Sequence, residues 1–234
     1  MNRLTGVAEL LDGPLDDPAA LVANLRDLAR LNRVSGGTSL SRRAIDALGS
    51  AADRPATTIL DVGTGGADIP IALLAHAARA GRDLAVTATD SRPEVLAAAR
   101  VARPAVHRIP GLTLELADGH GLPYPDAAFD VTHASLVLHH LEPGDAVAFL
   151  RELSRVARDG IVVNDLVRGR VAWLGAWLAV HTLATASYTR HDGPLSVRRA
   201  YSRAQLLRLL TDAGLRPIAT IVGLAGHRVA IAAR

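Results

Sequence analysis

The chain has 234 residues, 49% of them hydrophobic and 21% charged, which is enough for one large domain and excludes a disordered or collagen-like protein. Cysteine is absent, and this excludes disulfide bonds, thiolate metal sites and a cysteine nucleophile. The net charge of +3 comes from arginines scattered among 23 acidic residues without forming a basic stripe, so we expect no nucleic-acid partner.

Two helices are predicted near the N-terminus. Leucines recur at helical spacing over residues 17–31, and Asp16 or Asp17 is the expected N-cap of this first helix. The sequence Ser35-Gly36-Gly37 ends it, because glycine favours the backbone conformations that terminate helices. A second helix is expected over residues 39–48.

Apolar strands and Ala- and Leu-rich helices then alternate. Strands are predicted over residues 57–62, 84–89, 112–116, 129–134 and 160–165, and helices over residues 68–80, 93–102, 143–157 and 202–213. Two last strands, 215–222 and 228–232, have no helix between them and would form a hairpin. This order predicts an α/β fold, with a doubly wound, mainly parallel sheet that contains one antiparallel strand.

The expected domain organisation follows from changes in this pattern. We interpret residues 1–54 as an N-terminal helical cap and residues 55–234 as the main domain, because Arg54-Pro55 separates the two patterns. Residues 166–200 are too long for a plain connection and are predicted to form an inserted helical lid.

Within this insertion, the charge-free run 171–180 carries two tryptophans on one helix face. We consider a core helix, a lid over an apolar substrate, and a helix in contact with a membrane surface. The run is too short for a membrane span, which needs about 20 apolar residues. The N-terminus also lacks the long apolar run of a signal peptide, so a cytoplasmic location is expected.

A glycine turn gives the strongest functional signal. The sequence Asp61-Val62-Gly63-Thr64-Gly65-Gly66-Ala67-Asp68 predicts a strand that passes through the turn into a helix, where the backbone can approach a ligand closely. Asp61 and Asp68 would lie beside the phosphates of a dinucleotide, which is unfavourable in a partly desolvated crevice. S-adenosylmethionine carries a sulfonium and an ammonium but no phosphate, so the crevice favours this cation.

Acidic residues also follow the next two predicted strands. Asp90, with Ser91 beside it, ends the second strand 25 residues after Gly65, where an acid can accept from both ribose hydroxyls. Asp118 and Gly119 follow the third strand and are placed to hold adenine. Each residue alone is equally well a helix cap or a turn former. Their positions after three successive strands predict a ligand that contains adenosine.

These motifs stand in one order along residues 55–165, and the fourth strand continues it with Phe129-Asp130-Val131 and then Ser135-Leu136-Val137-Leu138-His139-His140-Leu141. The series resembles that of class I S-adenosylmethionine-dependent methyltransferases. The resemblance implies a Rossmann-like sheet of seven strands, the last one reversed, with S-adenosylmethionine as cofactor. Arg33 is expected to reach the methionine carboxylate if the N-terminal helices cover the cofactor. The complete set of expected cofactor-binding residues is Arg33, Asp61, Gly63, Thr64, Gly65, Asp68, Asp90, Ser91, Asp118, Gly119 and Ser135.

Residues and motifs that the sequence lacks exclude several classes of methyl acceptor. The lack of cysteine excludes carbon-5 methylation of pyrimidines, and His133-Ala134-Ser135-Leu136 replaces the Asn/Asp-Pro-Pro-Tyr motif of enzymes that methylate amines of nucleic-acid bases. The fourth strand ends without carboxylates, so we expect no metal. Residues 24–33 and 188–193 resemble bacterial small-molecule methyltransferases of polyketide or phenolic lipid pathways. A small, largely apolar or aromatic acceptor in secondary metabolism is expected, with a phenolic oxygen preferred.

Four residues are candidates for catalysis. His139 and His140 follow the fourth strand, where a neutral imidazole can take a phenolic proton, although the pair equally well opens a helix and packs. Asn164 and Asp165, at the end of the fifth strand, would orient the acceptor or form a structural cap.

Several functional alternatives remain open from the sequence alone. The chain could instead be a carbon methyltransferase of quinone or polyketide type, which would contact a membrane peripherally, or a binding protein without transferase activity. Dinucleotide-dependent oxidoreduction is a further alternative, against which Asp68 is the main argument. A monomer and a homodimer are both compatible with the sequence.

Overall fold

The computed structural model describes residues 1–51 and 57–234, so the predicted boundary at Arg54-Pro55 lies outside the described residues. Seven strands form one sheet in the order β3-β2-β1-β4-β5-β7-β6. The strands are β1 (Thr58–Val62), β2 (Ala85–Asp90), β3 (Leu112–Leu116), β4 (Phe129–Ser135), β5 (Ala157–Leu166), β6 (Pro217–Val222) and β7 (Arg228–Ala233). The first five are parallel, and β7 runs antiparallel to both β5 and β6. The predicted α/β fold with its reversed last strand is therefore confirmed.

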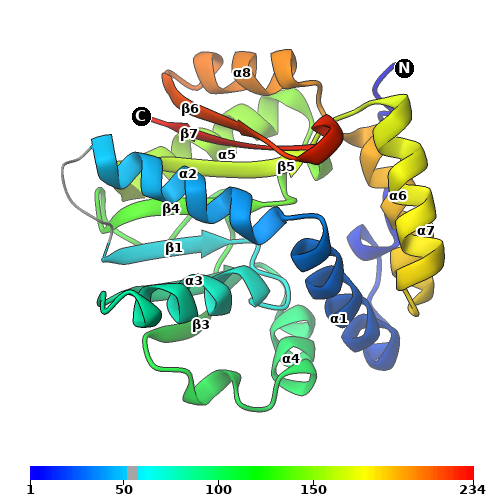
Figure 1. Cartoon of the computed structure of the whole chain (residues 1–234), viewed down its shortest axis with the longest axis horizontal. Coiled ribbons are helices and arrows are strands. Elements are labelled where there is room, and N and C mark those ends of the chain that lie inside the picture. Colours follow the sequence, from blue (N-terminus) through cyan, green and yellow to red (C-terminus); the bar gives the residue numbers. More distant parts are fainter. Residues whose placement is uncertain (52–56) are drawn as a thin grey trace.

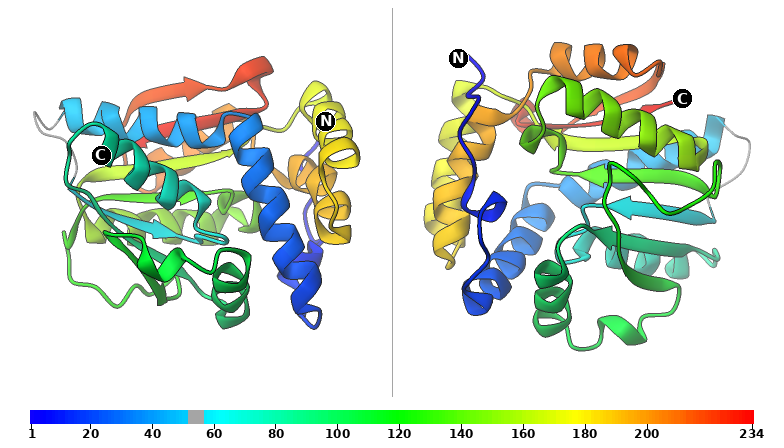
Figure 2. Two further views of the ribbon diagram at one scale, coloured as in Figure 1. Left: turned by 60° about the horizontal axis from the view of Figure 1, so that its bottom comes forward. Right: turned by 180° about the vertical axis from the view of Figure 1, so that it is seen from behind.

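Helices cover both faces of the sheet (Figures 1 and 2). The helices are α1 (Pro18–Val34), α2 (Gly37–Ala51), α3 (Asp68–Arg79), α4 (Pro93–Ala102), α5 (Pro143–Val156), α6 (Arg170–Leu183), α7 (Ser187–Arg199) and α8 (Arg203–Asp212). One apolar core joins α2 and α3 to the sheet, and a second joins α5 and α8 to its other face. Burial of these two cores is the main stabilising contribution, because both sheet faces are removed from water.

Local signals explain the ends of α1. The side chain of Asp17 accepts from the backbone N–H of Ala20 at 2.9 Å, so Asp17 is the N-cap, and Pro18 occupies the first turn. After Val34 the chain turns at Gly36, whose φ of 77° lies in the left-handed region that favours glycine. The two N-terminal helices then take different places: α2 packs directly on the sheet, whereas α1 packs against α4.

The predicted insertion forms α6 and α7, which lie beside α1 at one end of the sheet (Figure 1). The charge-free run lies in α6, where Ala172 and Val180 are buried but Leu174, Trp177 and Leu178 are exposed, so α6 is not a core helix. Among residues 1–51 and 57–234, no helix combines the length and apolar character that crossing a membrane requires. A peripheral membrane contact and the division into cap and main domain stay predictions.

Leu150 tests the packing of α5 against the sheet, because its side chain is completely buried in the larger core. We expect Leu150→Ala to lower the free energy of unfolding by about 2–5 kcal/mol, measured by urea denaturation. Leu174→Ala, at a position that is 52% exposed, is the matched control and should change stability much less. Equal losses for the two variants would contradict this account of the core.

Candidate active site

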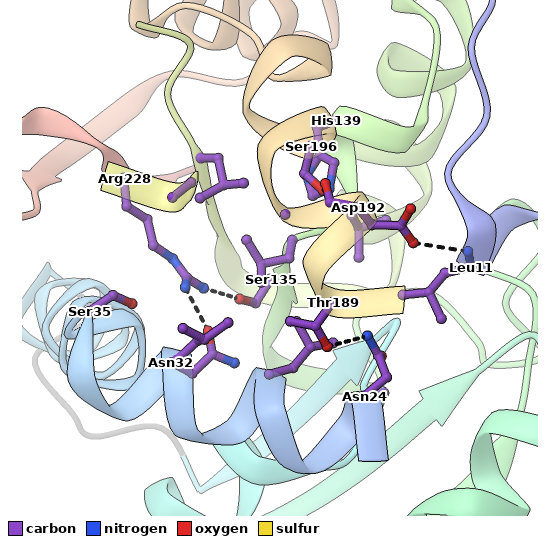
Figure 3. Close-up of a pocket in the computed structure, with 18 of the residues that line it drawn as sticks. Leu11, Asn24, Asn32, Ser35, Ser135, His139, Thr189, Asp192, Ser196 and Arg228 are labelled. Atoms are coloured by element: carbon purple, nitrogen blue, oxygen red, sulfur yellow. Dashed lines mark hydrogen bonds between the residues drawn. The ribbon is translucent and has the colours of Figure 1, made fainter. Parts of the chain in front are cut away.

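A cavity of about 660 Å³ lies where β1, β2 and β4 end, under α1, α6, α7 and the N-terminal segment (Figure 3). Two of its walls differ in character. The wall formed by the strand ends is polar and includes Asp61, Gly63, Thr64, Gly65, Asp68, Asp90, Ser91 and Ser135. The wall formed by α1 and α6 is apolar and includes Leu21, Leu25, Leu28, Ala172, Ala176, Val180 and Leu183. The cavity therefore joins a polar crevice to an apolar pocket.

The glycine turn shapes the polar crevice. Gly63 has a φ of 73°, and a Cβ atom added to it would lie 2.6 Å from Cγ2 of Val137. Both the backbone conformation and the close contact thus require glycine at this position. The N–H of Gly65 donates to Oδ2 of Asp90 at 3.1 Å, which ties the turn to the end of β2. Burial raises the pKa of Asp90, and the hydrogen bonds from the backbone oppose this.

A buried hydrogen-bond chain begins at Asp61. Nδ1 of His133 lies 2.5 Å from Oδ1 of Asp61, and Nε2 of His133 lies 2.7 Å from Oγ of Ser41. Ser41 accepts from Nδ2 of Asn164 at 2.7 Å, so its own hydrogen is free to donate to His133. The imidazole then carries its proton on Nδ1 and donates to Asp61, which satisfies a carboxylate that is only 3% exposed.

Arg228, at the start of β7, continues this chain to the second acid of the crevice. Its guanidinium donates to Oδ1 of Asn164 at 2.7 Å, to Oδ1 of Asn32 at 2.6 Å and to Oγ of Ser135 at 2.8 Å. Asn32 donates to Oδ2 of Asp68 at 3.0 Å. Burial lowers the pKa of Arg228 to about 10, which still leaves it charged near neutral pH. Burial raises the pKa of Asp68, and the hydrogen bond from Asn32 opposes this rise.

Asn164, a predicted catalytic residue, is a buried link in this chain. Its Nδ2 also donates to the backbone oxygen of Gly37 at 2.8 Å, so both ends of its amide are engaged within the protein. Asn164 thus lies on β5 and bonds to both α2 and β7, where it supports the crevice without lining it. Gly37 lies directly against the guanidinium of Arg228, and an added Cβ atom would collide with it.

His139 lies in the short helix η3 (Leu138–His140) and lines the cavity. Its Nδ1 is 2.7 Å from Oδ1 of Asp165, and its backbone N–H donates to Oδ2 of the same carboxylate at 3.1 Å. Burial would raise the pKa of Asp165, but the adjacent His139 outweighs it and holds this pKa below its usual value. Asp165 thus keeps the proton of His139 on Nδ1 and leaves Nε2 as a hydrogen-bond acceptor.

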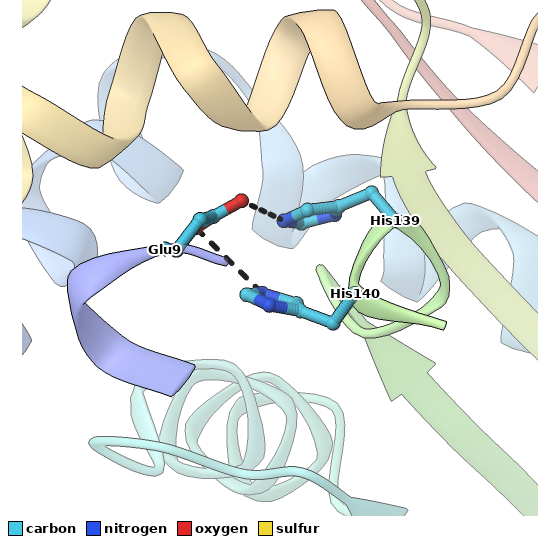
Figure 4. Close-up of side chains that lie close together, drawn as sticks. All are labelled: Glu9, His139 and His140. Carbon is cyan, nitrogen blue, oxygen red and sulfur yellow. Dashed lines mark ion pairs between the residues drawn. The ribbon is translucent and has the colours of Figure 1, made fainter. Parts of the chain in front are cut away.

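His140 lines the same end of the cavity beside an N-terminal segment (Figure 4). Its Nδ1 is 2.7 Å from Oδ1 of Asp12 in the short helix η1 (Leu10–Asp12). Glu9, one residue before this helix, lies between the two histidines: its carboxylate oxygens are 3.8 Å from Nε2 of His139 and 3.9 Å from Nε2 of His140. Glu9 is buried and was not predicted from the sequence.

Three other predicted residues lie elsewhere. Arg33 is exposed, whereas its neighbour Asn32 lines the cavity. Asp118 is exposed and accepts from the backbone N–H of His120 at 3.0 Å, and Gly119 is packed closely against Phe149. Their proposed contacts with the methionine carboxylate and with adenine stay predictions. Residues that sequence reasoning did not assign to the site are Glu9, Asn32, Ser41, His133 and Arg228.

Comparisons with known proteins agree with this geometry. Residues 59–160 match the family model described as a methyltransferase domain. An uncharacterized 37.1 kDa protein in a transposon of Streptomyces fradiae is 31% identical over 217 residues, which are 92% of this chain and 56% of that protein. Malonyl-(acyl-carrier protein) O-methyltransferase of Serratia marcescens is 34% identical over 138 residues, 57% of this chain and 48% of that enzyme. The chain thus spans about half the length of these curated relatives.

The fold comparison extends further along the chain. The crystal structure of an S-adenosylmethionine-dependent methyltransferase from Aquifex aeolicus superimposes with a TM-score of 0.61 at 21% identity, covering 93% of this chain and 97% of that one. Residues 59–160 are thus similar to a methyltransferase domain, and the sheet order and the glycine turn are those of the S-adenosylmethionine-dependent methyltransferase fold. A crevice with three carboxylates and a glycine turn fits the sulfonium and ammonium groups of S-adenosylmethionine.

Asp90 tests the ribose end of this crevice. We expect Asp90→Ala to weaken binding of S-adenosylmethionine in calorimetry, because two charge-assisted hydrogen bonds of about 1.5–3 kcal/mol each would be lost. Asp83→Ala, an exposed aspartate just before β2, is the matched control and should bind normally. An unchanged affinity in Asp90→Ala would remove this residue from the cofactor site.

Proposed function

We propose that the protein transfers the methyl group of S-adenosylmethionine to a hydroxyl oxygen of a small, largely apolar acceptor, with a phenol as the preferred class. The observation that carries this proposal is the position of His139 in the cavity. His139 lines the end of the cavity where His140 and Glu9 also lie, and Asp165 orients its ring. A base that lines the cavity can act on an acceptor whose body lies against the apolar wall.

The proposed role of His139 follows from its tautomer. When the acceptor hydroxyl ionises, its O–H bond breaks and the proton moves to Nε2 of His139, while the oxygen keeps the electron pair for the new bond to the methyl carbon. The imidazolium that forms is stabilised by the buried carboxylate of Asp165, 2.7 Å from Nδ1. When bound, S-adenosylmethionine supplies the methyl group on a positively charged sulfur.

The apolar wall would contribute by orientation and by excluding water. Leu25 and Leu28 of α1 face this part of the cavity together with Ala176 and Val180 of α6. Such a wall binds the ring or chain of the acceptor through its apolar surface and leaves the acceptor hydroxyl free to contact His139. Holding the two reacting atoms together is a large part of catalysis for a displacement whose leaving group is already activated.

The comparisons support this proposal at a coarser level. The relative from Serratia marcescens is an O-methyltransferase by its name, but the chain covers only 48% of it, so the acceptor of that enzyme is not transferred to this chain. Within the proposal, Asn164 is excluded because Arg228 engages its amide, and His140 differs from His139 in burial: the His139–Asp165 pair is buried, whereas the side chains of His140 and Asp12 are 25% and 28% exposed. We therefore place the base at His139.

His139→Ala and Asp165→Asn test the base. With a panel of phenols and quinone precursors, we expect the wild-type protein to release S-adenosylhomocysteine. His139→Ala should lower kcat by about 10²–10⁴-fold, the usual contribution of a general base. Asp165→Asn should also lower kcat, because the amide no longer stabilises the imidazolium. Affinity for S-adenosylmethionine should persist in both variants.

His107→Ala, at an exposed position of η2 (Val106–Arg108), is the matched control and should retain full turnover. If His139→Ala turns over a phenol as fast as the wild-type protein does, His139 is not the base. Product methylated at carbon instead of oxygen would favour the quinone-type alternative. Binding of S-adenosylmethionine without turnover of any acceptor would favour a binding protein.

A further inference from the structure

Three hydrogen-bond acceptors converge at one end of the cavity (Figure 4). The Nδ1 atoms of His139 and His140 are bonded to Asp165 and Asp12, so both rings carry their proton on Nδ1 and present a lone pair on Nε2. Both Nε2 atoms lie near the carboxylate of Glu9, at 3.8 and 3.9 Å. These distances are too long for hydrogen bonds, and a carboxylate offers no hydrogen to either ring.

Glu9 has one oxygen that is not satisfied. Oε2 accepts from Oγ of Ser196 at 2.9 Å, whereas Oε1 is buried and has no hydrogen-bond partner in the described part of the chain. Glu9 is only 4% exposed and lines the cavity. An unpaired buried acceptor of this kind is costly, so Oε1 marks a position where a ligand can provide a donor.

The N-terminal segment is held in a way that fixes Glu9 at this position. The N–H groups of Leu10 and Leu11 donate to the carboxylate of Asp192 in α7, at 2.9 and 3.2 Å. Arg199 of α7 pairs with Asp12 and donates to the backbone oxygen of His140. The orientation of Glu9 toward the histidines is therefore determined by α7 and η3 together.

The surroundings favour a neutral donor over a metal ion. Nη1 of Arg199 lies 3.7 Å from Oε1 of Glu9, so a fixed positive charge already stands beside the three acceptors and would repel a second cation. The two measured separations are also longer than the edge of a tetrahedral zinc site, whose bonds are about 2.0–2.2 Å long. The cavity wall formed by α1 and α6 is apolar, which suits an aromatic ring.

We propose that this end of the cavity binds an aromatic acceptor that carries two adjacent hydroxyl groups, one donating to Nε2 of His139 and the other to Oε1 of Glu9. A single hydroxyl has one hydrogen and leaves one of these acceptors unpaired. Because Nε2 and Oε1 are only 3.8 Å apart, two hydroxyls on neighbouring ring carbons can reach both acceptors at once over hydrogen bonds of about 2.8 Å. This inference rests on the proposed function, since it describes the acceptor of that reaction.

Three naphthols test the inference without requiring turnover. With the protein saturated by S-adenosylhomocysteine at pH 8, fluorescence titration compares 2,3-dihydroxynaphthalene, 2,7-dihydroxynaphthalene and 2-naphthol. We expect the adjacent diol to bind about tenfold more tightly than the other two, which is the effect of one additional hydrogen bond. Equal binding of the three compounds, or no binding of the adjacent diol, would overturn the proposal.

Glu9→Gln gives the matched variant. Ser196 would keep the amide oxygen, so the amide N–H₂ would replace Oε1 and present donors where the wild-type protein presents an acceptor. The tenfold preference should disappear, and affinity for S-adenosylhomocysteine should persist. Glu94→Gln, at an exposed position of α4, should keep the preference. A preference that survives in Glu9→Gln would overturn the proposal.

The pH dependence of the wild-type protein gives a second measurement that needs no variant. Burial raises the pKa of Glu9 to about 7, so its carboxylate is ionised at pH 8 and largely protonated at pH 6. The preference should therefore shrink as the pH falls, because the protonated group no longer acts only as an acceptor. The charged and titratable groups that face Glu9 are His139, His140, Asp12, Asp192 and Arg199.

Two further outcomes are separated by parallel titrations. Zn²⁺ that binds the wild-type protein tightly but not Glu9→Gln would overturn the proposal and assign the three residues to a metal. If the wild-type protein does not bind S-adenosylhomocysteine, the proposed function itself is contradicted. The failure of the acceptor inference is therefore distinguishable from the failure of methyl transfer.

Discussion

The cavity depends on the compensation of buried carboxylates. Asp61 is buried and Asp68 is half-buried beside the cavity, where an unpaired charge is unfavourable by several kcal/mol. The hydrogen-bond chain through His133, Ser41, Asn164, Arg228 and Asn32 supplies this compensation. Its members come from β4, α2, β5, β7 and α1, so the interaction that stabilises the acids also fixes the N-terminal helices relative to the sheet. The geometry of the crevice and the packing of the N-terminal helices therefore depend on the same hydrogen bonds.

The two ends of the cavity differ in their electrostatics. At the crevice, the carboxylates of Asp61 and Asp68 accept hydrogen bonds from the protein and remain available to a ligand with positively charged groups. At the other end, Asp165 accepts from Nδ1 of His139, and Asp12 accepts from Nδ1 of His140. Each imidazole therefore has its lone pair on Nε2. Aspartate thus has two roles: at the crevice it is available to a cationic ligand, and at the other end it fixes the tautomer of a histidine. This division suits the proposed reaction, in which a charged methyl donor and a neutral acceptor share one continuous cavity.

The fold was predictable because its signals are local. Strand–helix alternation, the N-cap at Asp17 and the glycine turn at Gly63 each depend on residues within a few positions of one another. Asp61 and Asp90 could be placed at one edge of the sheet for the same reason, since they stand at the carboxyl ends of two strands, whereas Asp118 after the third strand is exposed. Asn164 and Asp165 show where such reasoning stops. Neighbouring strand residues point to opposite faces, so only Asp165 reaches His139, while Asn164 turns toward α2.

Contacts between distant segments had no signal in a single sequence. Arg228 meets Asn32 across 196 positions, and Glu9 meets His139 through a segment held by α7. Neither pair has a spacing or a composition that distinguishes it from surface charge. The long chain between such partners means that only the folded topology brings them together.

Gly37 shows how far the demands of the cavity extend. It begins α2 and does not line the cavity, yet it borders the guanidinium of Arg228, which belongs to the hydrogen-bond chain between Asp61 and Asp68. Even a methyl group at this position would push the cation out of its place. We therefore expect a substitution at Gly37 to change ligand affinity through Arg228, although Gly37 itself does not line the cavity.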